Sequence, residues 1–273
     1  MSAAEPGTGP ATFRAAFAAE LRAQRERMGL LQREFAEKAH VSLSSVKQYE
    51  AGKKRPDRKF AIWCDGFYGC PGTFERLYDG MTAESYPSWF GPRVLFEDKA
   101  TRIHEWEMRA IPGLLQTRSY ASAVIGACRP YDSQEELERD AAARVERQNI
   151  LTRDDPPKLW VVLNEGVLRQ AVGGARVMRE QLDHLLSLAD AQGIVLQVLP
   201  FAVPDAPGVD GPAAIFEFDD SATVAYLEGW GSGRVLKDAK EVTAIATALS
   251  MIKGCALSPI DSAQFMTKIR SEL

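Results

Sequence analysis

The fold of this chain is decided by the stretch Phe17–Pro56, which reads FAAELRAQRERMGLLQREFAEKAHVSLSSVKQYEAGKKRP. Together with Phe13, the apolar residues Phe17 and Leu21 recur at every fourth position and predict the buried stripe of a first helix. Gly29 is expected to end this helix, because glycine readily takes the left-handed backbone conformation found at helix ends. The stretch therefore opens with an amphipathic helix and a stop.

Two more short helices are predicted beyond the stop. The second runs from near Leu31 to Ala39, and its inward residues are predicted to be Leu31, Phe35, Ala36 and Ala39. His40 falls where a tight turn is needed, and histidine is one of the non-glycine residues enriched at positive φ. Ser42 is a candidate N-cap for a third helix, Leu43–Ala51, which would bury Val46 and Tyr49 and end at Gly52.

The outward face of the third predicted helix carries hydrogen-bonding side chains, namely Ser44, Ser45, Lys47 and Gln48. An α-helix fits the major groove of B-DNA, and residues near its N-terminus read base edges. Glutamine can contact adenine through two hydrogen bonds, lysine can donate to guanine, and serine can reach either base. This face therefore predicts a DNA-reading helix.

Basic residues follow this helix directly. Lys53, Lys54 and Arg55, and then Arg58 and Lys59, form a cluster suited to phosphates. Gln32, at the start of the second helix, is expected to hydrogen-bond a phosphate together with the helix N-terminus. A three-helix packing unit with a solvated basic face is the alternative, but spacing, turn, polar face and basic run together favour DNA binding.

The same stretch resembles the helix-turn-helix of Cro and phage-repressor-type regulators, also called the xenobiotic-response-element (XRE) type. The usual pattern there is roughly GLTQEELAERLGVSRSTVSRIERGRRRP, where this chain has GLLQREFAEKAHVSLSSVKQYEAGKKRP. Leu31 replaces the usual threonine and removes an N-cap, and His40 replaces the usual glycine. The resemblance implies that the DNA-facing positions are Gln32, Ser42, Ser44, Ser45, Lys47 and Gln48.

Composition is that of an ordinary globular protein: 273 residues, 45% apolar and 26% charged. We expect no membrane span and no signal peptide, and the four cysteines lack the spacing of a zinc site or disulfide framework. These features favour a cytoplasmic protein.

Charge is divided unevenly along the chain, whose net charge is −4. Residues 1–80 carry 13 Lys+Arg against 10 Asp+Glu, a balance of +3, whereas the remainder carries 20 against 27, a balance of −7. Because the positive balance coincides with the helix-turn-helix, we expect that end to meet phosphate and the other end not to.

The remainder alternates predicted strands and helices. Strands are predicted around Ile103–Met108, Leu159–Asn164 and Ile194–Pro200, and a hairpin joins Ala213–Phe218 to Thr223–Glu228. Ser133 and Glu136 form a capping-box signature for a long helix. The predicted fold class is an all-α helix-turn-helix domain followed by an α+β domain. We place a disordered lead at 1–11, the DNA-binding domain at 12–82, and a regulatory and dimerisation domain at 83–273.

A second resemblance covers residues 86–273. The segments IPGLLQTRSYA, ARVERQNIL, LWVVLNEGVLRQAVGG, MREQLDHLL, VLQVLPF and VAYLEG look like the C-terminal domain of actinobacterial WhiJ-like regulators. The resemblance implies a transcription regulator paired with a small partner protein in an antitoxin-like arrangement.

Catalytic and metal chemistry find little support. Neither His104 nor His184 has metal-ligand spacing, no G-x-S-x-G elbow occurs, and Cys128 and Cys255 lack an adjacent base. We therefore predict no catalytic residue, no metal and no cofactor.

A polar constellation in the second half is open to two interpretations. It comprises Arg144, Gln148, Asn164, Glu165, Arg169 and Glu228, with Trp160 and Tyr226 at its rim, and it also includes Arg147. If strand ends meet the long helix, these residues form an effector pocket. The alternative is a buried salt-bridge network that fixes sheet against helix.

The function predicted from the sequence is that of a sequence-specific transcription regulator which binds double-stranded DNA as a homodimer, on half-sites about one helical turn apart. Its second domain would receive a protein or small-molecule signal. The alternative is an antitoxin-like protein whose main task is to bind a small cognate partner. An enzyme with a DNA-binding head is the third reading, and no catalytic constellation supports it.

Overall fold

The computed structural model describes residues 12–84, 86–204, 208 and 210–273. The chain divides into two compact units, Met1–Leu95, here called the head, and Phe96–Leu273, here called the sheet unit. This division falls after the predicted boundary at 82/83. Gly91 packs so closely against Ala83 that a Cβ at position 91 would lie 3.2 Å from the Ala83 Cα, so the chain stays with the head beyond residue 83. The predicted disordered lead, 1–11, lies outside the described residues.

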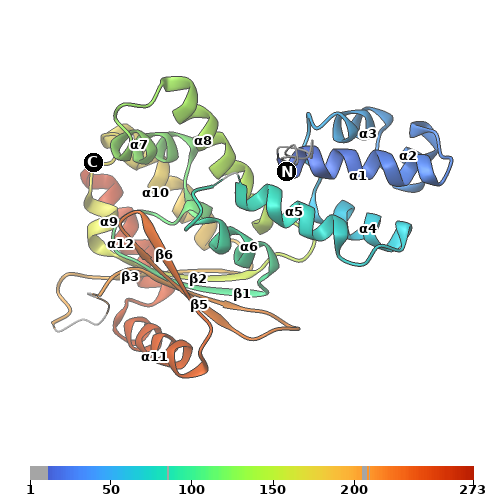
Figure 1. Cartoon of the computed structure of the whole chain (residues 1–273). Coiled ribbons are helices and arrows are strands. Elements are labelled where there is room, and N and C mark those ends of the chain that lie inside the picture. The colour runs from blue at the N-terminus through green and yellow to red at the C-terminus, as the bar shows by residue number, and fades with distance from the viewer. Residues whose placement is uncertain (1–11, 85, 205–207, 209) are drawn as a thin grey trace, which may run out of the picture. The chain divides into compact units, whose positions relative to one another are not determined.

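The head is helical throughout, as predicted (Figure 1). Its helices are α1 (Phe13–Arg27), α2 (Gln32–Lys38), α3 (Leu43–Glu50), α4 (Arg58–Tyr68) and α5 (Thr73–Glu84). A sixth helix, α6 (Gly91–Lys99), begins in the head and ends in the sheet unit. Helix α6 was not predicted from the sequence, although Pro92 lies in its first turn, where proline is well tolerated.

Aromatic rings fill the core of the head. Phe35 is fully buried and stacks on Tyr68 with 5.8 Å between ring centroids, while Phe17 and Phe74 meet edge to face at 5.1 Å. An aromatic ring buries a large apolar area per residue, so a few rings are enough to give a small helical unit a stable core. Val46 and Tyr49 of α3 belong to this core, so the predicted inward face of the third helix is confirmed.

The turn between α2 and α3 also follows the prediction. His40 has φ +52° and is the only non-glycine residue at positive φ among those described. Leu31 does not follow its prediction. It is 67% exposed, so the prediction that it faces inward is wrong. Leu31 is the N-cap of α2, where the extended backbone turns the side chain away from the core.

The sheet unit holds one six-stranded sheet in the order β3-β2-β1-β4-β5-β6. Its strands are β1 (Arg102–Glu107), β2 (Lys158–Asn164), β3 (Ile194–Leu199), β4 (Ala213–Glu217), β5 (Val224–Gly229) and β6 (Ser232–Leu236). Strands β1 to β3 run parallel, and β4 to β6 form an antiparallel meander joined to β1. The hairpin of β4 and β5 is therefore confirmed, and the unit is α+β as predicted.

Helices cover the two faces of the sheet unequally (Figure 1). The parallel strands are connected by 3₁₀-helix η1 (Gly113–Leu115), α7 (Arg118–Cys128), α8 (Gln134–Arg147), 3₁₀-helix η2 (Gln148–Leu151), α9 (Glu165–Arg169) and α10 (Ala175–Ala189). Helices α9 and α10, with the C-terminal α12 (Pro259–Glu272), bury one face of the sheet. Helix α11 (Ala239–Cys255) packs on the opposite face.

The long helix α8 begins as its sequence indicates. The Ser133 backbone N–H donates to the Glu136 carboxylate at 3.0 Å, and the Glu136 N–H donates to Ser133 Oγ at 3.3 Å. This reciprocal pair satisfies two helix-start donors that would otherwise lack partners. The predicted capping box is confirmed.

Candidate nucleic-acid interface

Helix α3 is held at its start by a local hydroxyl cap. Ser42 Oγ accepts a hydrogen bond from the Ser45 backbone N–H at 3.0 Å, so the predicted N-cap is confirmed. The hydroxyls of Ser42 and Ser45 also pair with each other at 2.9 Å. Both hydroxyls therefore serve the start of the helix, although the sequence analysis counted them among the DNA-facing groups.

Three of the predicted reading residues lie together on the exposed face of α3. Ser44, Lys47 and Gln48 are exposed, and Gln48 Nε2 donates to Ser44 Oγ at 3.4 Å. That contact uses one of the two amide hydrogens, so the other hydrogen and Oε1 remain for further hydrogen bonds. The arrangement holds a glutamine amide in position on a surface without a carboxylate.

The sequence analysis missed one exposed residue of this face. Leu43, the first residue of α3, has a side chain that is 37% exposed. In an amphipathic helix a leucine is expected on the buried side. The one signal for the exposure of Leu43 is its place at the first position of the helix, before the first buried residue, Val46.

The basic run after α3 divides into two kinds of side chain. Lys53 and Lys54 are exposed, as a phosphate contact requires. Arg55 instead donates to Thr82 Oγ1 and lies 4.6 Å from the Tyr78 ring centroid. Its guanidinium is directed against α5 rather than outward, because a flat cation gains both a hydrogen bond and a ring contact there.

Arg58 likewise does not extend the cluster as predicted. Its guanidinium donates to Glu75 and to Asp79, each at 2.7 Å. These two ion pairs tie the start of α4 to α5. The structure therefore places Lys53 and Lys54, rather than both arginines, as the exposed cations beside α3.

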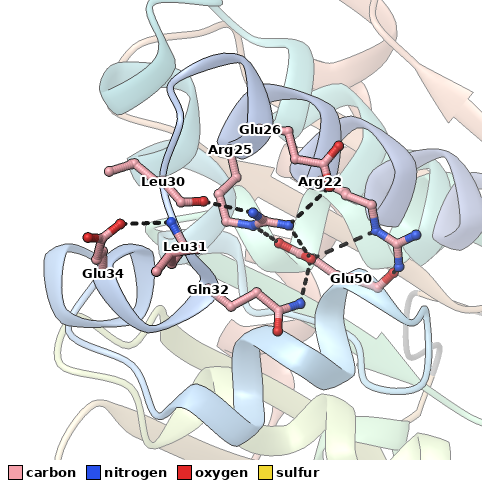
Figure 2. Close-up of polar contacts among 8 residues, drawn as sticks. All are labelled: Arg22, Arg25, Glu26, Leu30, Leu31, Gln32, Glu34 and Glu50. Atoms are coloured by element: carbon pink, nitrogen blue, oxygen red, sulfur yellow. Dashed lines mark hydrogen bonds and ion pairs between the residues drawn. The ribbon is translucent and has the colours of Figure 1, made fainter.

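A buried carboxylate at the end of α3 organises the motif (Figure 2). Glu50 is 4% exposed, and Arg25 of α1 donates to both of its oxygens, at 2.5 and 3.0 Å. Arg25 also donates to the Leu30 carbonyl at 2.8 Å, between α1 and α2. An ion pair with two hydrogen bonds fixes orientation as well as distance, so it fixes the angle between α1 and α3.

Gln32 joins this contact instead of projecting freely toward a phosphate. Its Nε2 donates to Glu50 Oε2 at 2.8 Å, as Figure 2 shows. The predicted hydrogen bond to a phosphate would therefore have to come from the second amide hydrogen of Gln32 or from backbone N–H groups at the start of α2. There the Leu31 N–H is already bonded to the Glu34 carboxylate at 2.8 Å.

The charge state of Glu50 follows from these partners. Burial alone raises the pKa of a carboxyl group, but hydrogen bonds from Arg25 and Gln32 and the charges of Arg25 and Arg22 outweigh it. The pKa of Glu50 is consequently held below its ordinary value. The group is an anion at neutral pH, and it stabilises the motif in that form.

The residues of the predicted pocket lie at separate places in the sheet unit. Arg144 Nη1 donates to Gln116 Oε1 at 3.1 Å, and Gln148 Nε2 donates to the Gly113 and Gln116 carbonyls at 2.9 and 2.7 Å. Arg144 in α8 and Gln148 at the start of η2 thus fasten these two helices to the η1 segment.

A second group surrounds the start of α9. Asn164 Oδ1 accepts from the Gly166 N–H at 2.8 Å, and Glu165 accepts from Arg169 Nε at 2.5 Å and from the Phe201 N–H at 2.8 Å. Arg169 also pairs with Glu272 of α12 at 3.0 Å. These contacts cap α9 and tie it to the last helix.

The proposed rim residues do not meet. Trp160 packs in the cluster that includes α11, whereas Tyr226 is buried in the cluster that includes α10 and α12. Their strands present them on opposite faces of the sheet, so the prediction of one pocket rimmed by both is wrong. Glu228 pairs instead with Arg109 at 2.8 Å.

Arg147, also part of that constellation, forms a buried ion pair with Glu97 at 3.3 Å. Glu97 lies in the last part of α6, so the pair fixes this part of the helix to α8. The network interpretation thus describes these contacts better than the pocket does, because the charged groups pair with one another and tie separate elements together.

One polar chain was not foreseen, and it lies on the α11 face. Lys253 Nζ is 2.9 Å from His104 Nδ1, and His104 Nε2 is 3.2 Å from Glu217 Oε1. Because an ammonium only donates, Nδ1 accepts and Nε2–H donates to the carboxylate, which defines a neutral imidazole. Lys253 also lies 4.5 Å from the Trp160 ring centroid. Sequence spacing gave no signal for it, since 149 positions separate Lys253 from His104.

Burial and the Lys253 charge lower the pKa of His104, against the opposing effect of Glu217. Burial likewise lowers the pKa of Lys253. The lowered pKa of His104 favours the neutral imidazole, whereas burial works against the charged form of Lys253.

Two general searches concern the described residues only. No group of three or more His, Cys, Asp or Glu side chains is placed there to hold a metal ion. No single helix of this part of the chain meets the length and hydropathy needed to cross a membrane, although α11 and α12, bent by 68°, meet it as a pair.

In the head, the capped helix α3 follows directly after a tight turn, as in a helix-turn-helix. The profile of a family described as a helix-turn-helix domain matches residues 16–77, in agreement with this geometry. A second profile, described as a domain of unknown function (DUF5753), matches residues 92–268. Since that match spans more than half of the chain, the protein belongs to the DUF5753 family. No curated protein and no solved structure matches the chain.

The buried pair leads to a prediction for the head. Replacing Glu50→Gln leaves Arg25 buried without its counter-charge and should cost about 3–5 kcal/mol of head stability. Hydrogen exchange of the α1 and α3 amides in the full chain measures this loss. The matched control is Glu37→Gln, which removes an exposed pair with Arg33 and should cost at most about 0.5 kcal/mol. Equal protection in both variants would contradict the assigned role.

The His104 chain leads to a pH prediction for the sheet unit. The folded pKa of His104 lies below the ordinary 6.5, so the unfolded chain takes up the proton more readily. The contribution of His104 to the free energy of unfolding is therefore fully present above pH 6.5, and it is lost as the pH falls through the lowered folded pKa. Urea unfolding at about pH 7.5 and about pH 5.5 should show this loss.

The variant His104→Gln keeps one donor and one acceptor but cannot titrate, so it should lose less stability between the two pH values. His184→Gln is the comparison variant: burial also lowers the pKa of His184, so its replacement should likewise reduce the pH dependence, but without removing a contact of Lys253. An unchanged pH dependence in His104→Gln would refute the role given to this imidazole.

Proposed function

We propose that the protein is a sequence-specific transcription regulator that inserts α3 into the major groove of double-stranded DNA. The observation that carries the proposal is the exposed face of α3, where Ser44, Lys47 and Gln48 lie together, beside Lys53 and Lys54. The three face residues offer hydrogen bonds to base edges, and the two lysines offer cations to phosphates. This division matches the separation of base reading from positioning seen in DNA complexes.

The XRE-type resemblance supports the same proposal at a finer level. Helix α2 and the buried Glu50 contact hold α3 at a fixed angle, so a rigid helix rather than a flexible loop would meet the groove. Regulators of this kind read two half-sites about one helical turn apart, which requires a homodimer. We assign dimerisation and signal reception to the sheet unit, and we place the protein in the cytoplasm.

Two observations favour that assignment to the sheet unit. Residues 81–273 carry the acidic balance of −7, which disfavours phosphate contact and suits a basic partner. The WhiJ-like resemblance of residues 86–273 implies a small cognate partner protein in an antitoxin-like arrangement. The proposal gives this unit no catalytic step. Capture of such a partner as the main task remains the second candidate function, with a small-molecule effector as the other possible signal.

The reading face gives a direct test. In the full chain, Lys47→Ala with Gln48→Ala should cost about 1–3 kcal/mol on the preferred duplex and flatten the preference among duplexes. Lys53→Ala is the matched control, because a lost phosphate contact should weaken all duplexes alike. Fluorescence anisotropy at one fixed salt concentration measures both. An undiminished sequence preference in the double variant would remove α3 as the reading helix.

The assembly gives a second test. Light scattering after size exclusion should show twice the 30.1 kDa chain mass at micromolar concentration. A monomeric mass, both free and on DNA, would contradict the dimer. An equimolar complex with a small basic protein, formed by a chain that ignores all duplexes, would favour the second candidate function instead.

A further inference from the structure

The leucine at the start of α3, Leu43, is 37% exposed, so part of its side chain is available for a contact outside the head. Leu43 is absent both from the buried core of the head and from the half-buried side chains packed against it. Val46, three residues further along, is fully buried, so Leu43 lies at the edge between the buried and the exposed side of the helix. A single exposed leucine is common on protein surfaces, but this one lies at the start of the helix whose first residues would meet the bases.

The surroundings of Leu43 indicate what it would contact. Lys47 lies one helical turn further along, and Ser42 and Ser44 on either side are small enough to let another surface approach closely. The only carboxylate of α3, Glu50, is buried against Arg25. The surface around the leucine is therefore cationic and polar, which fits nucleic acid and not an apolar protein face.

Bases differ in what they offer to an apolar group in the major groove. Thymine alone presents a methyl group there, beside its O4 acceptor, while adenine presents the N7 and N6 pattern that a glutamine amide matches. Gln48 Nε2 donates one amide hydrogen to Ser44 Oγ, so its second amide hydrogen and its Oε1 remain for a base. The face thus combines one apolar and one amide reader, the pair suited to A·T base pairs.

We propose that Leu43 is a specificity-determining residue that packs against the 5-methyl group of a thymine in the half-site occupied by α3. This inference rests on the proposed function, because it requires α3 to enter the major groove. Leu43 excludes water from the methyl group, and Gln48 reads an adenine of the same half-site. Ser44 also holds the Gln48 amide for that contact, through the hydrogen bond between the two side chains.

The test removes one methyl group from the DNA. Preferred duplexes are selected from a random pool with the full chain, and each thymine is then replaced in turn by deoxyuridine. At one position this should weaken the wild-type protein about fourfold, the equivalent of about 0.8 kcal/mol for one buried carbon group. Fluorescence anisotropy at fixed salt gives the affinities.

The variants complete a double-mutant cycle. Leu43→Ala should bind the thymine duplex about fourfold more weakly and should no longer distinguish it from the deoxyuridine duplex. Leu31→Ala is the matched control, since Leu31 is an equally apolar and more exposed leucine of the head. It should keep the wild-type response to deoxyuridine.

The outcomes separate the two levels of the argument. If no duplex is selected, the proposed function fails and this inference fails with it. If duplexes are selected but no deoxyuridine position matters, or Leu43→Ala still senses the methyl group, this inference alone is overturned. The wild-type comparison needs no variant, so it holds even if Leu43→Ala does not fold.

Discussion

The geometry of the DNA-binding head depends on one buried ion pair, between Glu50 at the end of α3 and Arg25 of α1. A carboxylate that is almost fully buried is costly unless its charge is compensated and its oxygens are hydrogen-bonded. Here the guanidinium meets both oxygens, and Gln32 brings the start of α2 to the same group. One charge thus connects the three helices on which the motif depends.

That constraint separates reading from support on a short helix. The inner side of α3 carries Val46 and Tyr49 in the core together with the anchored Glu50, while the outer side carries Ser44, Lys47 and Gln48. The anchored residues lie toward the end of the helix, and the hydroxyl cap fixes its start. A helix of 8 residues would not be stable alone, so its order comes from these contacts.

In the sheet unit, polar side chains tie together elements that lie far apart in the chain. Arg144 and Gln148 hold the η1 segment, while Glu165 and Arg169 hold α9 against α12. The chain of Lys253, His104 and Glu217 is different, because it joins a helix to the middle of the sheet through a neutral imidazole. Its charge pattern changes as the pH falls through the lowered pKa of His104, whereas an arginine keeps its charge over that range.

The sequence by itself determined the features that depend on neighbouring residues. Periodicity located the head helices, the turn at His40 and the cap at Ser42 followed from backbone preferences, and the Ser133–Glu136 box marked α8. The hairpin between β4 and β5 was likewise readable from its short polar turn. Each of these signals acts within a few residues, so no knowledge of the folded chain is needed.

Only the tertiary structure decided which distant side chains meet. Trp160 and Tyr226 lie on opposite faces because strand order and alternation direct them there, and Arg55 and Gln32 turned inward because acceptors from other helices were within reach. The exposure of Leu43 and Leu31 was decided in the same way. A side chain's direction depends on which partners the fold brings close, and sequence spacing does not encode contacts between residues far apart in the chain.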